Sequence, residues 1–185
     1  MSRVTEEILA TGQYLQLSRI QFKLNSSDKA HNYEVCERID NHGGVDVIAL
    51  VEYPDRPTEI VLVLEYRVPM NNFCVGFPAG GMEAGETSAN AAIRELREET
   101  GYTGQIISIS PPLASLQSMT SSIGYLVRVR IDGTQYPHPP AQSLDPTECI
   151  QVIKVPVASL SSTLLQYSED GYDIDAKLFA LSQTL

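Results

Sequence analysis

The sequence predicts an α/β (α+β) fold, in which a mixed sheet is flanked by helices and follows a small N-terminal β segment. Apolar, β-branched runs recur along most of the chain, and few segments show helical periodicity. The stretch DNHGG at residues 40–44 has the composition of a turn and marks a boundary. We therefore expect an N-terminal β segment over residues 1–43 and a main domain over residues 44–185.

The strands are predicted from alternating apolar and polar side chains and from β-branched residues. Two strands are expected in the N-terminal segment, YLQLSRIQFKL and NYEVCERI. Those expected in the main domain are VDVIALVEY, EIVLVLEYRV, FCVGFPAG, QIISIS, IGYLVRVRI and ECIQVIKVP. A long Ser-rich loop is expected over residues 110–122. The tail after residue 156 is expected to form two short helices that are interrupted at Glu169-Asp-Gly.

Composition and charge argue against several classes of protein. The net charge of −10 argues against a nucleic-acid partner, because contacts with a phosphate backbone need an excess of Lys and Arg. No apolar run approaches the roughly 20 residues of a membrane span, and the acidic N-terminus is unlike a signal peptide. We expect an intracellular, cytoplasmic location, with the nucleus as an alternative. The cysteines Cys36, Cys74 and Cys149 are widely spaced, and buried free thiols are predicted.

Glutamates gather in the segment GGMEAGETSANAAIRELREETGY, residues 80–102. Hydroxyl side chains precede its alanine-rich run and Gly101 follows it, which predicts a helix from about Ser88 to Thr100. Spacings of three and four residues bring Glu95, Glu98 and Glu99 together on this helix. Such like charges destabilise a helix by a few tenths of a kcal/mol each, so we expect a cation among them.

Two explanations of this cluster are open. The ordinary one is a solvated acidic helix face. The other is a hard divalent cation, which prefers oxygen ligands and which the preceding loop can help to bind through a backbone carbonyl and Glu86. Arg94 and Arg97 are expected to project elsewhere, since adjacent helical positions do not face each other.

The spacing of the segment resembles the signature of the Nudix hydrolases, which cleave a nucleoside diphosphate linked to another moiety. Gly80 is followed after five residues by Glu86, and after seven more by the run RELREETG that begins at Arg94. Only the final position, usually aliphatic, differs, and it is Tyr102 here. The resemblance implies an α/β/α sandwich whose loop and helix bind Mg²⁺ or Mn²⁺, with two or more ions per site.

Further segments resemble the ADP-ribose pyrophosphatase branch, which hydrolyses ADP-sugars. They are EYRVP at residues 65–69, GFPAG at residues 76–80, Glu148, and the closing helix around residues 175–179. The resemblance implies hydrolysis of the pyrophosphate bond of ADP-ribose or a related ADP-sugar, which gives AMP and a sugar 5-phosphate. It also implies a homodimer whose N-terminal strands contribute to each site.

Two positions depart from the family pattern, and they leave alternatives open. The loop at residues 110–122 has neither the proline nor the acid that relatives carry there, and Gly76 stands where they often have a glutamate. The substrate is then another nucleoside diphosphate sugar or a dinucleotide, or the chain is a non-catalytic nucleotide-binding module. The intact glutamate set argues against the binding module.

The resemblance also implies roles for single residues. The metal ligands are the carbonyl of Ala79 and the carboxylates of Glu95, Glu98 and Glu99. The catalytic residues are Arg94 and two competing candidates for the general base, Glu98 and Glu148. The substrate-binding residues are Tyr14 and Tyr33 at the adenine, Arg38 and Arg67 at phosphate or ribose, and Gly80. The residues that shape the loop are Gly80, Glu86 and Gly101. As alternatives, the tyrosines face the core, the two strand-end arginines form surface ion pairs, and Glu148 faces solvent.

Overall fold

The computed structural model describes residues 2–26 and 28–184. Residues 1, 27 and 185, which belong to the two predicted domains, lie outside the described residues. The chain divides into two compact units. The first comprises the chain up to Gly43 together with Pro112–Gly124, and the second comprises Gly44–Pro111 and the chain from Tyr125 onward. The sequence does not indicate that residues 112–124 belong with the N-terminal strands.

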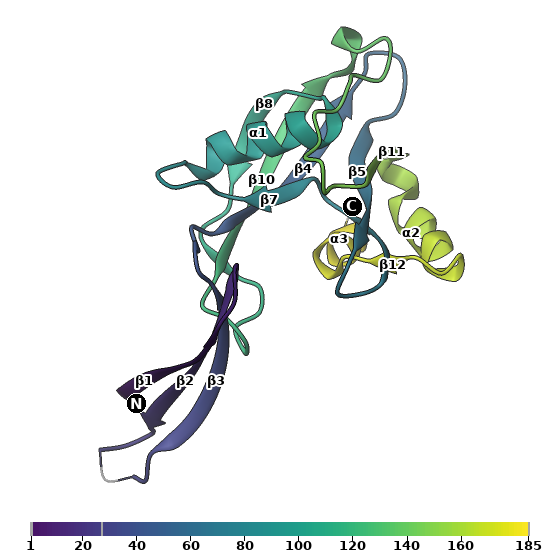
Figure 1. Ribbon diagram of the computed structural model, residues 1–185. Helices are drawn as coiled ribbons and strands as arrows, with labels where there is room; N and C mark the ends of the chain where they lie inside the picture. Colours follow the sequence, from purple (N-terminus) through teal and green to yellow (C-terminus); the bar gives the residue numbers. More distant parts are fainter. Residues whose placement is uncertain (1, 27, 185) are drawn as a thin grey trace. The chain divides into compact units, whose positions relative to one another are not determined.

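The first unit contains a three-stranded antiparallel sheet in the order β1-β2-β3 (Figure 1). Its strands are β1 (Ser2–Thr11), β2 (Leu15–Lys23) and β3 (His31–Arg38). The two strands predicted in this segment correspond to β2 and β3, but β1 was not predicted. Register shifts lie between Arg3 and Thr5 and between Ile8 and Ala10 in β1, and such irregularities break the alternation by which a strand is recognised.

The Ser-rich loop of the first unit is hydrogen-bonded to β3. Within it, β9 (Leu113–Ala114) pairs with the first residues of β10 (Ile123–Asp132). Cys36 N donates a hydrogen bond to Met119 O at 2.8 Å. Glu37 accepts from Thr120 Oγ1 at 2.7 Å and from Ser121 N at 2.8 Å. The loop is therefore ordered by partners more than 80 positions away in the sequence.

The second unit is built on a mixed sheet in the order β12-β6-β5-β4-β10-β8, with β11 paired to β5 and β7 paired to β4. Its further strands are β4 (Gly44–Glu52), β5 (Glu59–Arg67), β6 (Asn72–Gly76), β7 (Ala79–Gly81), β8 (Gln105–Ile109), β11 (Ile150–Pro156) and β12 (Asp173–Ile174). Strand β12 runs parallel to β6, and the neighbouring pair β5 and β6 is antiparallel. The six predicted strand segments of the main domain all contain strands of this sheet.

Three helices cover this sheet: α1 (Ser88–Thr100), α2 (Leu160–Glu169) and α3 (Ala176–Ser182). Short 3₁₀ turns occupy Gly133–Gln135 and Val157–Ser159. The bounds of α1 confirm the prediction, because Thr87 Oγ1 accepts from Asn90 N and Gly101 ends the helix with φ 76°. The two predicted helices of the tail are also present.

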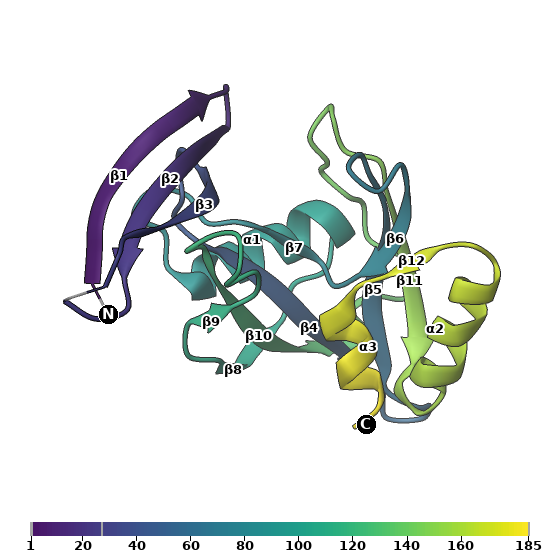
Figure 2. The ribbon, with the colours of Figure 1, turned by 90° about the horizontal axis from the view of Figure 1, so that it is seen from below.

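Successive apolar side chains of β4 and β5 point to opposite faces of the sheet, so each face has its own apolar core. Val47 and Val61 pack with Leu96 of α1. Their neighbours Ile48 and Ile60 point to the other face, as successive strand residues do. There they pack with apolar residues of α2 and α3, namely Leu160, Leu164 and Leu178. The unit is thus an α/β/α sandwich, with α1 on one face and α2 and α3 on the other (Figure 2).

The cysteines are all free, as predicted. Cys36 and Cys74 are half-buried, but Cys149 is exposed, so burial was wrongly predicted for it. Cys149 ends the Pro-rich connector just before β11 and therefore does not reach the core. No helix in residues 2–26 and 28–184 combines the length and the apolar character needed to cross a membrane.

Candidate active site

Arg94 lies at the centre of a carboxylate cluster in the second unit. Its guanidinium contacts Glu86 through Nε and Nη2 at 3.0 and 2.9 Å. Nη1 contacts Glu95 at 2.7 Å and Glu98 at 3.3 Å. The expectation that Arg94 projects away from the glutamates was wrong. Its long side chain turns back along α1, so that one guanidinium serves three carboxylates, whereas Arg97 is largely exposed.

The loop before α1 is fixed by the same ion pair. Arg94 Nη2 donates to the carbonyl oxygen of Gly81 at 2.8 Å, and Glu86 Oε2 accepts from Glu83 N at 2.9 Å. The hydrogen bond from Arg94 lowers the pKa of Glu86. These contacts join the loop to the helix, which supports the role predicted for Glu86 and Arg94.

Glu99 is the least compensated carboxylate of the cluster. Glu99 is only 3% exposed to solvent, and its Oε2 accepts a hydrogen bond from Ala79 N at 3.0 Å. Glu99 has no ion pair among the described residues, and burial raises its pKa to about 8. Burial also raises the pKa of Glu95, although Arg94 opposes this. The cluster is therefore not a solvated acidic face.

Gly80 lies directly against Glu95. A Cβ atom at position 80 would collide with the carboxylate of Glu95. Glycine is therefore the residue that lets this carboxylate reach the loop beside Ala79.

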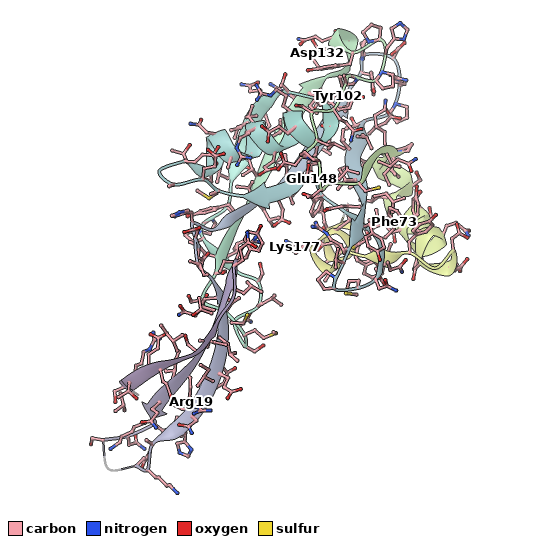
Figure 3. All side chains as sticks on the ribbon, in the orientation of Figure 1. Arg19, Phe73, Tyr102, Asp132, Glu148 and Lys177 are labelled. Carbon is pink, nitrogen blue, oxygen red and sulfur yellow. The ribbon has the colours of Figure 1, made fainter. Side chains whose placement is uncertain are left out.

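Two further acids and an arginine belong to the same region. Glu65 on β5 pairs with Arg67 at 2.8 Å, and burial raises the pKa of Glu65. Burial is the main cause of the raised pKa values of Glu65, Glu95 and Glu99. The negative charge of Glu148 is a smaller cause that raises each of these pKa values further. Figure 3 shows Glu148 near the C-terminal half of α1. Glu65 was not assigned a role from the sequence, although a charged residue inside the apolar run IVLVLEY was a signal.

The other predicted binding residues lie in the first unit. Tyr14 and Arg38 are exposed at one end of the β2–β3 pair, where Ile39 N donates to Tyr14 O. Tyr33 pairs with Ile20 further along, and its hydroxyl donates to Ser118 O at 2.6 Å. At about 3.3 Å per residue, six residues of β2 separate the two tyrosines by about 20 Å. Neither tyrosine is buried, so the alternative of core aromatics is excluded for both.

The donor set fits a divalent cation in its chemistry. Glu95, Glu98, Glu99 and the Ala79 carbonyl are the hard oxygen donors that such ions prefer. Their carboxylates outnumber the one guanidinium among them, and Glu99 is buried without a counter-charge in the described chain. In the arrangement observed, the guanidinium of Arg94 contacts Glu95 and Glu98. Within the described ranges, no three or more Asp, Glu, His or Cys side chains lie close enough together to coordinate a metal ion.

Comparison with known families decides what kind of domain this is. Residues 41–176 match the family described as the NUDIX domain. The chain belongs to the Nudix family. The Nudix match covers the sheet of the second unit, α1, α2 and the connector that carries Glu148, and it ends where α3 begins. Membership of this family makes the chain an enzyme of the hydrolase class, and Nudix hydrolases generally use divalent metal ions.

Curated relatives of this Nudix chain are similar along most of its length. The ADP-ribose pyrophosphatase of Saccharomyces cerevisiae is 31% identical over 177 residues, which is 92% of this chain and 76% of the relative. The ADP-sugar pyrophosphatase of Mus musculus is 27% identical over 187 residues, or 98% and 85% of the two chains. A solved structure described as an ADP compounds hydrolase shares the fold, with a TM-score of 0.67, 21% identity and coverage of 89% and 82%.

Proposed function

We propose that this chain hydrolyses the pyrophosphate bond of ADP-ribose or a related ADP-sugar, giving AMP and a sugar 5-phosphate, with Mg²⁺ or Mn²⁺ as cofactor. The observation that carries the proposal is the buried carboxylate of Glu99, which lies against Ala79 and has no counter-charge within residues 2–26 and 28–184. The names of the relatives from Saccharomyces cerevisiae and Mus musculus support the substrate class.

The proposed metal ligands are Glu95, Glu98, Glu99 and the carbonyl oxygen of Ala79, for two or more ions. A bound divalent cation neutralises the charge of pyrophosphate oxygens, so that water can attack phosphorus. The fixed loop of residues 81–87 holds the Ala79–Gly81 strand against the helix, because Arg94 bonds both Glu86 and the Gly81 carbonyl. Arg94 thus acts by positioning.

Glu148 is the proposed general base. Its competitor Glu98 contacts Arg94 at 3.3 Å and Arg97 at 3.9 Å. Glu148 instead accepts a main-chain hydrogen bond from Asp145 N at 2.9 Å, which leaves its other oxygen for a water molecule. A base has to lie within hydrogen-bond reach of the water that it deprotonates, and the location of Glu148 near the cluster supports this role.

Substrate binding is proposed for Arg67, Gly80, Tyr14, Tyr33 and Arg38. The guanidinium of Arg67 suits phosphate oxygens, and Gly80 lies directly beside the carboxylate of Glu95. Stacked aromatic rings lie about 4.5–7 Å apart. Because the tyrosines of one chain are about 20 Å apart along β2, an adenine between Tyr14 and Tyr33 requires one tyrosine from each of two chains. The stack is therefore proposed together with a homodimer whose N-terminal strands contribute to each site, and a cytoplasmic location stays a prediction.

The test is product release from a panel of ADP-ribose, ADP-glucose, UDP-glucose, GDP-mannose, NADH and diadenosine polyphosphates, each with Mg²⁺ and with EDTA. We expect metal-dependent AMP from ADP-ribose at a higher kcat/KM than from the others. Preference for another member of the panel would make that compound the substrate, and the proposed metal-dependent hydrolysis would still hold. No turnover of any member would contradict the proposed hydrolysis.

A further inference from the structure

Gln142 lies in the connector between Tyr136 and Ile150, and its side chain bonds the C-terminal end of α1. Nε2 donates to the main-chain oxygen of Glu99 at 2.6 Å and to that of Ile150 at 3.2 Å. One amide group therefore joins the helix to the first residue of β11. The last carbonyl groups of a helix have no partner inside it, and Gln142 provides a donor for one of them.

The main chain of the connector adds a second bond at this helix end. Ser143 N donates to the carbonyl oxygen of Glu98 at 2.8 Å. Gly101 leaves room for this approach, because a Cβ atom there would collide with the carbonyl oxygen of Ala141. The connector thus runs directly against the turn of α1 that carries Glu98 and Glu99.

The start of the connector is anchored by two tyrosines. The ring of Tyr136 packs edge-on against Tyr102, with centroids 4.8 Å apart at 62°. Thr103 N donates to the Tyr136 hydroxyl at 3.1 Å. Tyr102 is the one signature position that departs from the family pattern, and its ring gives Tyr136 a surface on which to pack.

The end of the connector carries Glu148 in a closed turn. Glu148 N donates to Asp145 O at 3.0 Å, and Asp145 N donates to Glu148 Oε2 at 2.9 Å. Between this turn and the anchored start, Gln142 and Ser143 make the bonds to α1. Glu148 therefore lies between two anchors. On one side are the bonds of Gln142 and Ser143 to α1. On the other side β11 begins to pair with β5, where Tyr66 N donates to Cys149 O at 3.4 Å.

We propose that Gln142 is a positioning residue, whose amide group holds the connector on α1 and so places Glu148 beside the carboxylate cluster. The proposal rests on the proposed function, in which Glu148 deprotonates water. Misplacement of a catalytic group by about 1 Å lowers a rate by up to roughly 100-fold. The competing reading is that Gln142 only caps the helix and affects stability.

The first experiment compares Gln142→Met with Gln151→Met in hydrolysis of ADP-ribose with Mg²⁺. Methionine keeps the length of glutamine and removes both N–H donors. Gln151 is an exposed neighbour on β11 whose side chain makes no hydrogen bond within the described part of the chain, so it controls for the substitution itself. We expect kcat to fall about 10-fold or more for Gln142→Met, with little change in KM, and no change for Gln151→Met. Equal activity of the two variants would overturn the proposal.

A double-variant cycle separates positioning from capping. If Gln142 acts through Glu148, Gln142→Met should lower kcat no further in a chain that already carries Glu148→Gln. If Gln142 only supports α1, the same loss should recur in that background, accompanied by a lower melting temperature. The second result would contradict a positioning role.

Hydrogen exchange of the metal-free chain gives a readout without activity. Amides of residues 143–145 and 147–149 should exchange faster in Gln142→Met than in the unsubstituted chain and in Gln151→Met. Unchanged exchange would overturn the proposal even if hydrolysis is confirmed. Conversely, an unsubstituted chain that fails to hydrolyse ADP-ribose contradicts the proposed function, while the exchange rates still decide the role of Gln142.

Discussion

Arg94 and Glu99 have opposite roles in the charge balance of the site: Arg94 pairs with several carboxylates, and Glu99 is a carboxylate that Arg94 does not reach. The guanidinium of Arg94 contacts Glu86, Glu95 and Glu98. Among the residues that the structure describes, the carboxylate of Glu99 accepts a hydrogen bond from Ala79 N alone. A buried carboxylate without a counter-charge is unfavourable, so the folded chain either protonates it or binds a cation. The spacing of Glu99 predicts that it lies with Glu95 and Glu98, but the sequence did not show that Arg94 would contact the other two glutamates and leave Glu99 unpaired in the described chain.

We expect the metal-free chain to lose stability through Glu99 as the pH rises. The folded state holds the proton up to about pH 8, whereas the ordinary value is 4.5. The folded state therefore binds more protons across this window, and the free energy of unfolding falls as the pH rises through it. Urea denaturation in EDTA should show wild type losing stability relative to Glu99→Gln, which has no carboxyl group to ionise, between pH 5 and 8. A difference between the two chains that is independent of pH would contradict the burial of an uncompensated carboxylate.

A divalent cation should reverse this loss. At pH 8, millimolar Mg²⁺ should raise the melting temperature of wild type, because a ligand that binds the folded state alone stabilises it. The same addition should have a smaller effect on Glu99→Gln. Thermal unfolding with Mg²⁺ and with EDTA measures both, and equal shifts for the two chains would argue against Glu99 as a ligand.

At the scale of elements, local signals predicted the helix and most strands, and distant partners decided the rest. The bounds of α1 were predictable because Thr87 and Gly101 have side-chain and backbone properties typical of helix ends. Strand β1 was missed because its register shifts interrupt the alternation. The bonds from Gln142 to α1 join residues 43 positions apart, and no local pattern encodes them.

Gly101 at the end of α1 has a matched control in Gly85, which lies in the loop before this helix. Gly101 and Gly85 have φ values of 76° and 77°, so an alanine at either position is strained by about 1–2 kcal/mol. At Gly101 the new Cβ also collides with the connector, whereas at Gly85 no atom lies within 4 Å. We expect Gly101→Ala to lower the free energy of unfolding by at least about 1 kcal/mol more than Gly85→Ala. Chemical denaturation measures both, and equal losses would show that the connector does not press on this helix end.

At the scale of the whole molecule, the two units differ in how far their apolar side chains are buried. The second unit has apolar cores on both faces of its sheet. The three-stranded sheet of the first unit leaves large apolar side chains exposed, among them Val4, Ile8 and Leu17. They do not form one face, because Ile8 pairs with Ser18 and successive strand residues such as Leu17 and Ser18 point to opposite faces. Contiguous exposed apolar side chains are typical of an interaction surface, and the proposed homodimer would cover those of one face. Residues 112–124 join this unit through Glu37, an association that the sequence did not reveal.

Light scattering tests the dimer with one substitution and one control. The unsubstituted chain should have the mass of two chains. Ile8→Lys, which places a charge on the N-terminal sheet at a side chain that is 59% exposed, should shift it toward the monomer. Leu165→Lys makes a similar change on α2 at 51% exposure and should leave the mass unchanged. A monomeric unsubstituted chain would exclude a site that is shared between two chains.

The central claim is that the glutamate cluster of α1 performs metal-dependent hydrolysis of an ADP-sugar. The most direct measurement is AMP release from ADP-ribose by wild type and Glu99→Gln, each with Mg²⁺ and with EDTA. We predict that EDTA abolishes release by wild type and that Glu99→Gln is slower by at least about 100-fold, which corresponds to about 2.7 kcal/mol of transition-state stabilisation. Release by Glu99→Gln at the wild-type rate, or release that persists in EDTA, would contradict the account.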